Sequence, residues 1–312
     1  MNAPTMRAAA FDEFGDADVL RTRELTRPPY GPKEVLVRVA VAGVQPVDVA
    51  VRSGALPPWA DITFPQVVGN EFAGTVEAVG ADVHDFAVGD EVVGFRVLGC
   101  YAEFVAVPAT QVVRKPAAVD WLTAGTLSAS GQTAHTALER LEATAGETLL
   151  VHGAAGGVGT MLVQLARARG LAVVGTAGAA NQEYVRSLGA IPVHYGDGQL
   201  DRIRAAAPGG IDLALDAAGR DSLRTAVELV ADRSRIGTIA DFDLAEELGC
   251  RPLRSDRSAA RLTELLARCA DGTLRVTIRA AYELDRAADA HRDVETGHGY
   301  GKVALLVGNQ VP

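Results

Sequence analysis

Residues 151–159 read VHGAAGGVG, and this glycine-rich stretch decides the fold class of the chain. It follows the short apolar run 148–150 and precedes residues 161–170, MLVQLARARG, whose apolar residues recur at helical spacing. A strand, a glycine turn and a helix in this order are typical of a dinucleotide-binding unit. Ala154 replaces the first glycine of the usual GxGxxG pattern, so the match is AxGxxG, and taken alone it also fits a plain tight turn.

The residue types of the turn suit a pyrophosphate. Gly156 has no Cβ, which lets backbone N–H groups approach a phosphate at the positive end of the following helix. Gly159 allows the helix to pack closely on the strand. The predicted cofactor contacts in the turn are Ala155, Gly156, Gly157, Val158 and Gly159.

Strand and helix patterns alternate outward from this turn. Apolar runs over residues 171–178 and 211–219 predict strands, and amphipathic segments over 181–190 and 222–231 predict helices. Strands alternating with helices of about ten residues indicate βαβ units. The sequence therefore predicts an α/β fold with a doubly wound parallel sheet of the Rossmann type.

The chain before this region has a different pattern. Short Val-rich runs over residues 34–44, 74–80, 90–97 and 102–109 predict a compact, barrel-like β domain. Residues 133–145 then predict a helix that Gly146 ends. The tail past residue 255 resumes the character of the first part. We predict a first domain of residues 1–120 and 255–312, with the nucleotide-binding domain, residues 121–254, inserted in it.

Composition excludes several classes of protein. The net charge of −9, without a clustered basic face, argues against nucleic-acid binding. No apolar run reaches the roughly 18 residues of a membrane span, and the N-terminus lacks the apolar core of a signal peptide. Cys100, Cys250 and Cys269 have neither metal-site nor CxxC spacing. We therefore predict a cytoplasmic, metal-free protein that binds neither nucleic acid nor membrane.

The end of the second strand in the alternating region decides the cofactor. An acid there would bind the ribose 2′-OH of NAD, but residues 174–178 read VGTAG and no acid precedes Glu183. No Lys or Arg stands in this loop either, and Arg186 is the nearest base. Thr176 and Gly178 can donate hydrogen bonds to a phosphate. The sequence favours NADP(H), with NAD as the open alternative.

Seven segments, in the expected order, resemble the medium-chain dehydrogenase/reductase superfamily and its zinc-independent quinone oxidoreductase-like branch. The segments are residues 42–54, 67–80, 86–95, 101–109, 146–159, 187–190 and 297–307. The resemblance implies a GroES-like β-barrel catalytic domain in which the Rossmann domain is inserted. It also implies hydride transfer from NADPH to a quinone or to an α,β-unsaturated carbonyl (enone).

Zinc-containing relatives carry catalytic Cys and His ligands in the first two segments and a four-Cys lobe after the third. Gln45 and Asn70 hold those ligand positions here, and residues 96–104 contain only Cys100. A neutral amide is a poor zinc ligand. The resemblance therefore implies metal-free reduction, in which the protein stabilises the oxygen that gains charge.

Gln45 and Asp48 are the catalytic candidates that the resemblance implies. Gln45 stands where the branch has an Asn beside the nicotinamide, and its amide either donates to a substrate oxygen or makes a structural bond. Asp48 either transfers protons or braces the loop. Tyr101 matches an aromatic position that packs, and Ala50 replaces a Tyr found in some quinone reductases.

Further positions are expected to contact ligands. Trp59 and Phe95 are expected to line the substrate pocket, with core packing as the alternative for Phe95. The resemblance implies that Thr133 faces the nicotinamide, with an ordinary helix position as the alternative. It also implies that Tyr195 lies near the adenosine phosphate or ribose, with packing at a strand end as the alternative. Ligands collect at the carboxyl edge of a parallel sheet. The strand ends expected there are Ala217, Ile239 and Ala240.

Three functions fit these observations. The first is an NADPH-dependent quinone or enone reductase, with a small molecule as its partner. The second is an enoyl reductase that acts on a polyketide or acyl thioester, because the same hydride transfer serves both. The third is a non-catalytic NADP-binding sensor or structural protein, since Gln45 and Ala50 depart from the branch. The resemblance also implies a homodimer.

Overall fold

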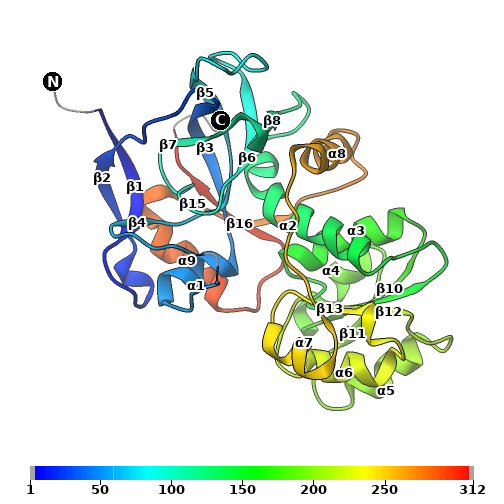
Figure 1. Cartoon of the computed structure of the whole chain (residues 1–312). Helices are drawn as coiled ribbons and strands as arrows, with labels where there is room; N and C mark the ends of the chain where they lie inside the picture. The colour runs from blue at the N-terminus through cyan, green and yellow to red at the C-terminus, as the bar shows by residue number, and fades with distance from the viewer. Residues whose placement is uncertain (1–3, 59, 309–312) are drawn as a thin grey trace. The chain divides into compact units, whose positions relative to one another are not determined.

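The computed structural model describes residues 4–58 and 60–308, and the chain divides into two compact units (Figure 1). Unit 1 comprises the residues up to Ala129, Arg257–Gly272 and the residues from Val276, and unit 2 comprises Ser130–Asp256 and Thr273–Arg275. Unit 2 thus interrupts unit 1 along the chain. The first division falls inside a helix, whereas the predicted boundary after residue 120 falls just before it, so the predicted domain limits remain a proposal.

Unit 2 is built on a six-stranded sheet of order β11-β10-β9-β12-β13-β14. Every neighbouring pair in the sheet is parallel. This order, with the first strand central and the chain crossing from one half to the other, is that of the Rossmann fold, so the predicted fold class is confirmed. The strands are β9 (Thr148–His152), β10 (Ala172–Ala177), β11 (Ile191–His194), β12 (Leu213–Asp216), β13 (Ile236–Thr238) and β14 (Arg251–Pro252).

Helices alternate with these strands, as the pattern predicted. They are α3 (Gly157–Ala168), α4 (Gln182–Ser187), α5 (Gln199–Ala206), α6 (Ser222–Leu229) and α7 (Phe242–Leu248). Leu149, Leu150 and Val151 of β9 have no exposed surface, because helices cover both faces of a parallel sheet. α7 and β14 were not predicted. Asp241 caps α7 by accepting the Leu244 N–H at 3.1 Å, a local pattern that the sequence does contain.

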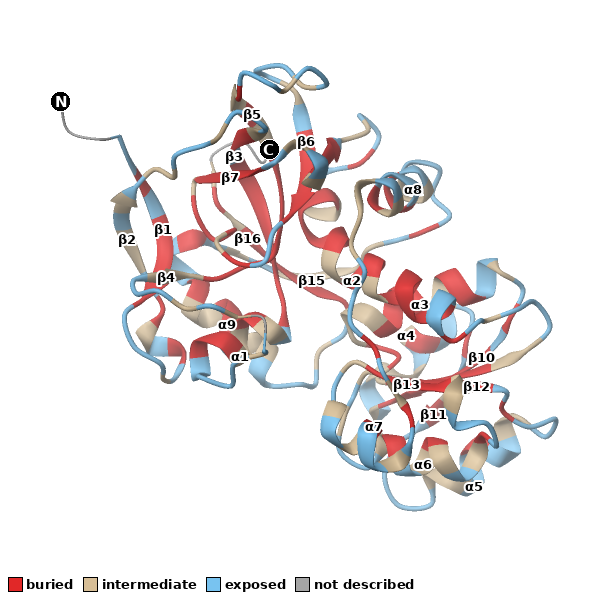
Figure 2. Cartoon of the chain, in the orientation of Figure 1, coloured by how far each residue is buried: buried red, intermediate tan, exposed pale blue. Residues whose placement is uncertain are grey.

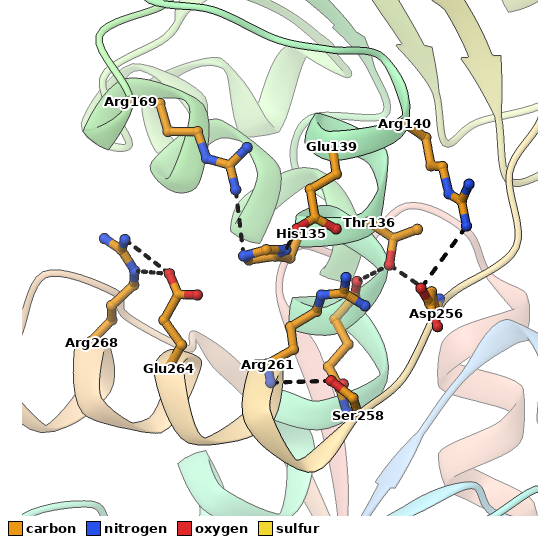
Figure 3. Close-up of polar contacts among 11 residues, drawn as sticks. His135, Thr136, Glu139, Arg140, Arg169, Asp256, Ser258, Arg261, Glu264 and Arg268 are labelled. Atoms are coloured by element: carbon orange, nitrogen blue, oxygen red, sulfur yellow. Dashed lines mark hydrogen bonds and ion pairs between the residues drawn. The ribbon is translucent and has the colours of Figure 1, made fainter.

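α2 (Trp121–Arg140) begins and ends earlier than the helix predicted over residues 133–145. Glu142 adopts a left-handed conformation with φ +52°, so the helix stops before Gly146. Figure 3 shows the contacts of its second half in unit 2. The His135 ring lies 3.4 Å from Arg169 and 3.5 Å from Glu139.

The second half of α2 also contacts the end of Ser130–Asp256, the longer segment of unit 2. The backbone N–H of Asp256, the last residue of that segment, donates to Thr136 Oγ1 at 3.1 Å (Figure 3). The Thr136 hydroxyl in turn donates to the Gln132 carbonyl at 2.7 Å, one helical turn back. The terminus of unit 2 is therefore anchored on α2.

Unit 1 contains a seven-stranded sheet, ordered β15-β16-β3-β5-β6-β8 with β7 paired to β3, and a three-stranded sheet, β2-β1-β4. The central strand β3 (Glu34–Val44) pairs with β5 along one edge and with β7 and then β16 along the other. The remaining strands are β1 (Thr5–Phe11), β2 (Arg21–Thr26), β4 (Gln66–Val67), β5 (Glu71–Val79), β6 (Glu91–Phe95), β7 (Phe104–Pro108), β8 (Val112–Arg114), β15 (Ile278–Glu283) and β16 (Lys302–Leu306).

The tail of the chain completes the core of unit 1. Figure 2 shows β3 and β16 buried side by side, and Val303 and Leu305 of β16 belong to the same hydrophobic cluster as Phe72 of β5. The helices of this unit are α1 (Pro46–Ser53), α8 (Ala259–Ala270), α9 (Ala287–Glu295) and the first part of α2. Ser258 caps α8 by accepting the Arg261 N–H at 3.2 Å (Figure 3). Short 3₁₀ turns span Ala17–Val19, Ala109–Gln111, Ala179–Asn181, Arg233–Arg235 and Leu284–Arg286.

Candidate functional site

The glycine turn follows directly from β9, which ends at His152. Gly153 has φ +76°, and a Cβ there would lie 3.1 Å from the carbonyl oxygen of Ala217. Ala154 keeps its φ outside the left-handed region, which is why alanine is tolerated at that position. Gly159 lies in the first turn of α3, where a Cβ would lie 2.2 Å from the Gly153 carbonyl oxygen. Only glycine therefore allows α3 to pack this closely on the turn.

The N-terminus of α3 is suited to an anion. Gly156 is the N-cap and offers no side chain to the N–H groups that follow it. The N–H groups of Gly157, Val158 and Gly159 lie in the first turn, where a helix has no internal acceptor for them. A Cβ at Gly156 would meet only the Gly153 carbonyl oxygen, at 3.4 Å, so the approach is open. These donors, together with the helix dipole, fit the pyrophosphate of a dinucleotide.

Thr176 lies buried at the end of β10 and contacts the turn from within. Its hydroxyl oxygen lies 3.2 Å from His152 Nδ1 and accepts the Gly153 N–H at 3.4 Å. The hydroxyl oxygen is thus engaged by the turn, and its donation to a phosphate stays a prediction. Burial lowers the pKa of His152 to about 4, although Asp216 acts in the opposite direction. His152 is therefore neutral at pH 7.

Asp216, at the end of β12, organises the two loops that follow β12 and β13. Its Oδ1 accepts the N–H groups of Ala218 at 2.9 Å and Gly219 at 2.8 Å. Its Oδ2 accepts the Thr238 hydroxyl at 2.8 Å, and Thr238 Oγ1 accepts the Ala240 N–H at 3.0 Å. These loops carry the predicted cofactor positions Ala217, Ile239 and Ala240. Asp216 was not predicted as a site residue, although it is an acid at the end of a buried apolar strand.

The position predicted for the adenosine lies where β10 and β11 end. A Cβ at Gly178 would lie 3.3 Å from the Tyr195 hydroxyl, so these two residues are neighbours. Tyr195 is 44% exposed, and its ring stacks on that of His194 with centroids 5.4 Å apart. Arg186, the nearest base, forms an exposed ion pair with Glu183 one helical turn away.

Two further predicted cofactor positions are Thr133 and Ala155. Thr133 lies on α2 and is half-buried. Ala155 is buried in the turn, and its carbonyl accepts the Thr160 hydroxyl at 3.3 Å. All the predicted cofactor positions lie in unit 2, on the turn, on α2, and at or past the carboxyl ends of β10 to β13. That they contact a cofactor stays a prediction.

In unit 1 a buried polar cluster surrounds the start of α1. It comprises Gln45, Asp48, Asn70, Glu71, Tyr101 and Lys302, none of which is more than 7% exposed. Asp48 Oδ2 accepts both the Gln45 backbone N–H and the Tyr101 hydroxyl at 2.9 Å. Its Oδ1 accepts Asn70 Nδ2 at 3.4 Å. Asp48 therefore caps α1, which is the bracing role that the sequence left open beside proton transfer.

Glu71 is the second carboxylate of the polar cluster. Its Oε1 accepts the Gln45 side-chain Nε2 and, at 3.1 Å, Lys302 Nζ. Its Oε2 accepts the Ala129 backbone N–H at 2.6 Å. The first residues of β5 and of β16 thus form an ion pair inside unit 1, and this pair engages the amide of Gln45.

Burial governs the protonation of this cluster. It raises the pKa of Asp48 from 3.8 to about 7, against the hydrogen bonds from Gln45 and Tyr101. Glu71 adds to the rise in this pKa and Lys302 opposes it. Burial also raises the pKa of Tyr101 well above its usual value. Near neutral pH, Asp48 is therefore divided between acid and carboxylate, and Tyr101 keeps its proton.

The predicted substrate residues are Phe95 and Trp59, and Trp59 lies outside the described residues. Phe95 ends β6 and is 6% exposed. The Arg257 guanidinium lies over its ring, 5.3 Å from the centroid, and donates to the backbone carbonyl of Asn70 at 2.8 Å. Phe95 is thus packed next to the polar cluster, and its contact with a substrate stays a prediction.

The two positions that hold zinc ligands in relatives carry amides bound to carboxylates. Gln45 donates to Glu71, and Asn70 donates to Asp48. Within residues 4–58 and 60–308, no three His, Cys, Asp or Glu side chains are grouped so as to hold a metal ion. This amide donor set does not fit zinc, which prefers thiolate, imidazole or carboxylate.

Known proteins match the chain over nearly its whole length. Two domain families match in part: the alcohol dehydrogenase GroES-like domain over residues 31–117 and the zinc-binding dehydrogenase family over residues 188–305. The quinone oxidoreductase of Lama guanicoe is 32% identical over an alignment of 326 residues, covering 97% of this chain and 98% of that protein. The chain belongs to the medium-chain dehydrogenase/reductase superfamily. Its likeness to quinone oxidoreductases confirms the predicted family.

Other members of the superfamily match as well. The polyketide synthase component PikAII of Streptomyces venezuelae is 33% identical over 320 residues, which cover 94% of this chain but 8% of that protein. The quinone oxidoreductase structure from Coxiella burnetii has a TM-score of 0.88 and 28% identity, over 98% of this chain and 100% of that one. The Escherichia coli quinone oxidoreductase complexed with NADPH has a TM-score of 0.86 and 25% identity, over 96% and 100%.

Some residues of this medium-chain dehydrogenase/reductase site were missed. Glu71 stands at the start of an apolar run, and Arg257 lies in a polar segment before a helix, so nothing local distinguishes them. Their contacts arise only from the pairing of distant segments. Across the described part of the chain, no helix has both the length and the apolar character that crossing a bilayer requires.

Proposed function

We propose that this protein is an NADPH-dependent, zinc-independent reductase that transfers hydride to a quinone or to an α,β-unsaturated carbonyl compound. One observation carries the proposal: at the two ligand positions of zinc relatives, Gln45 and Asn70 are amides hydrogen-bonded to Glu71 and Asp48. Such amides orient a polar group but do not act as Lewis acids. Quinones and enones are already electrophilic and need no such acid.

NADPH is the cofactor that unit 2 fits. The uncapped N-terminus of α3 suits the pyrophosphate, and no acid at the end of β10 selects the ribose 2′-OH of NAD. When bound, NADPH supplies the hydride. Competition between NADPH and NADH, followed by nicotinamide fluorescence, tests this choice. NADPH is expected to bind more tightly, and tighter binding of NADH would contradict it.

In unit 1 we assign the catalytic roles to Gln45 and Asp48. Besides the N–H donated to Glu71, the Gln45 amide has a second N–H, which is proposed to donate to the substrate oxygen. Asp48 is proposed to supply the proton that accompanies the hydride, so that one carbon gains the hydride and the oxygen or the neighbouring carbon gains the proton. Phe95 and Trp59 are proposed to contact the apolar part of the substrate.

Loss of nicotinamide absorbance with a panel of quinones, enones and enoyl thioesters tests the proposed function. Turnover of quinones or enones supports it. A clear preference for enoyl thioesters supports instead an enoyl reductase, a candidate that the similarity to a polyketide synthase component favours. NADPH binding without turnover of any acceptor would contradict both and leave a non-catalytic sensor or structural protein.

We also propose that the protein is a homodimer, as the family resemblance implies, and that it is cytoplasmic, as its composition predicts. Light scattering coupled to size-exclusion chromatography measures the mass in solution. A dimer gives twice the chain mass of 32.5 kDa, and the mass of one chain would contradict this assembly.

A further inference from the structure

The ion pair between Glu71 and Lys302 has no direct role in the proposed reaction. Its atoms lie 3.1 Å apart, and the two side chains are 0% and 2% exposed. Removing two charges from water is costly, and such a pair is by itself no source of stability compared with apolar side chains of similar size. Among the residues that the structure describes, Gln45 shares this Glu71 oxygen with Lys302.

We infer that Glu71 is a positioning residue that fixes the amide of Gln45, and that Lys302 is the counter-charge that keeps the Glu71 carboxylate in place. The inference rests on the proposed function, because Gln45 is a catalytic residue only in that reaction. The position of the proposed catalytic amide then depends on Glu71, the first residue of β5, and on Lys302, the first residue of β16.

The chemistry of Glu71 fixes which way the Gln45 amide faces. A carboxylate paired with an ammonium group only accepts hydrogen bonds, so it takes the NH₂ end of the amide. The carbonyl oxygen of Gln45 then points away from Glu71. Gln45 is 7% exposed, so its amide is packed rather than free to rotate in solvent. The second N–H of the amide is therefore left, in a fixed orientation, for a ligand.

The Glu71 carboxylate is itself held rigidly. Its two oxygens accept three donors, from Gln45, Lys302 and the Ala129 backbone. Gly43 leaves the room for it, since a Cβ there would lie 2.0 Å from Glu71 Oε1. Because rotation of the carboxylate would break at least one of these bonds, its position is transmitted to the Gln45 amide.

A double-mutant cycle tests the inference. Glu71→Leu combined with Lys302→Met removes both charges at similar volume and leaves no unpaired charge. We expect kcat to fall about tenfold to a hundredfold, the range of one hydrogen bond to a charged group, with KM for NADPH unchanged. In the Gln45→Ala background the same pair of substitutions is expected to add nothing, because the effect acts through Gln45.

The matched control is another ion pair of unit 1. Arg279 and Asp293 lie 3.0 Å apart and are 17% and 22% exposed, and neither belongs to the polar cluster. Arg279→Met with Asp293→Leu is expected to leave kcat unchanged. A loss of kcat in the Glu71/Lys302 variant that adds fully to the loss in Gln45→Ala would overturn the positioning role. An unchanged kcat in that variant would overturn it as well.

Nuclear magnetic resonance gives a readout that needs no turnover. The side-chain NH₂ resonances of Gln45, assigned by their loss in Gln45→Ala, are expected to exchange slowly with solvent and to shift in the Glu71/Lys302 variant. Exchange as fast as in solvent-exposed glutamines overturns the inference even if that variant does not fold. If no acceptor is reduced, the proposed function fails, while these resonances still report whether Glu71 fixes the amide.

Discussion

Two alanine substitutions in the glycine turn should separate the room needed by α3 from the room needed by the cofactor. At Gly156, φ is −70° and a Cβ would meet only the Gly153 carbonyl, at 3.4 Å, so Gly156→Ala fits the fold. At Gly159 a Cβ would lie 2.2 Å from the same oxygen and 2.7 Å from Ala154 Cα. These are backbone atoms of a buried turn, so they cannot yield without moving the turn.

The distances set the magnitudes. Ordinary contact begins near 3.4 Å, so Gly159→Ala must displace the backbone by about 3.4 minus 2.2 Å, or more than 1 Å. Overpacking of this kind costs about 1–3 kcal/mol, which corresponds to a fall in Tm of roughly 2–12 °C. Gly156→Ala, in contrast, should change Tm little, because the methyl group makes no clash and the poorer N-cap offsets the restriction of the unfolded chain.

Thermal unfolding and a fluorescence titration with NADPH measure the two effects. Gly156→Ala is expected to unfold like wild type but to raise the Kd for NADPH at least about tenfold, because its methyl group occupies the approach to the N–H donors. Gly209→Ala is the control, since a Cβ there meets nothing within 4 Å. Wild-type affinity in Gly156→Ala would refute the placement of the pyrophosphate. A wild-type Tm in Gly159→Ala would refute the packing argument.

Three further perturbations follow from the buried carboxylates. Gly43→Ala should displace the Glu71 carboxylate from Lys302. Because breaking a buried ion pair costs about 3–5 kcal/mol, the free energy of unfolding measured in urea should fall by that order. An unchanged urea midpoint would contradict this. Burial raises the pKa of Asp48 from 3.8 to about 7, so the wild-type free energy of unfolding should fall as the pH rises from 4 through 7, by the order of 4 kcal/mol. Asp48→Asn should not show this fall. A stability difference between the two proteins that is the same at every pH would contradict the prediction. Asp216→Ala removes three hydrogen bonds of 2.8–2.9 Å and should lower the free energy of unfolding by about 2–4 kcal/mol. A lower Tm and weaker NADPH binding are expected together. A lower Tm with unchanged NADPH binding would contradict a role of these loops in binding the cofactor.

The sequence by itself determined the nucleotide-binding unit, because the information for it is local. Apolar runs predict β9, β10 and β12, amphipathic segments predict the helices that alternate with the strands, and this alternation implies parallel pairing. The glycine turn can be recognised for the same reason, since a side chain at Gly159 would meet the backbone of Gly153 and Ala154, a few positions earlier in the sequence. The amides at Gln45 and Asn70 could also be recognised without a structure.

Only the tertiary structure decided which polar groups meet. Glu71 and Lys302 are 231 positions apart, and they meet because β3 pairs with β5 on one edge and with β16 on the other. Likewise, Thr176 turns its hydroxyl onto the glycine turn because the parallel register sets it beside His152. Burial, which raises the pKa of Asp48, is also a property of the packed chain. Periodicity reports which face of an element is apolar, but long-range pairing determines which charges share a core.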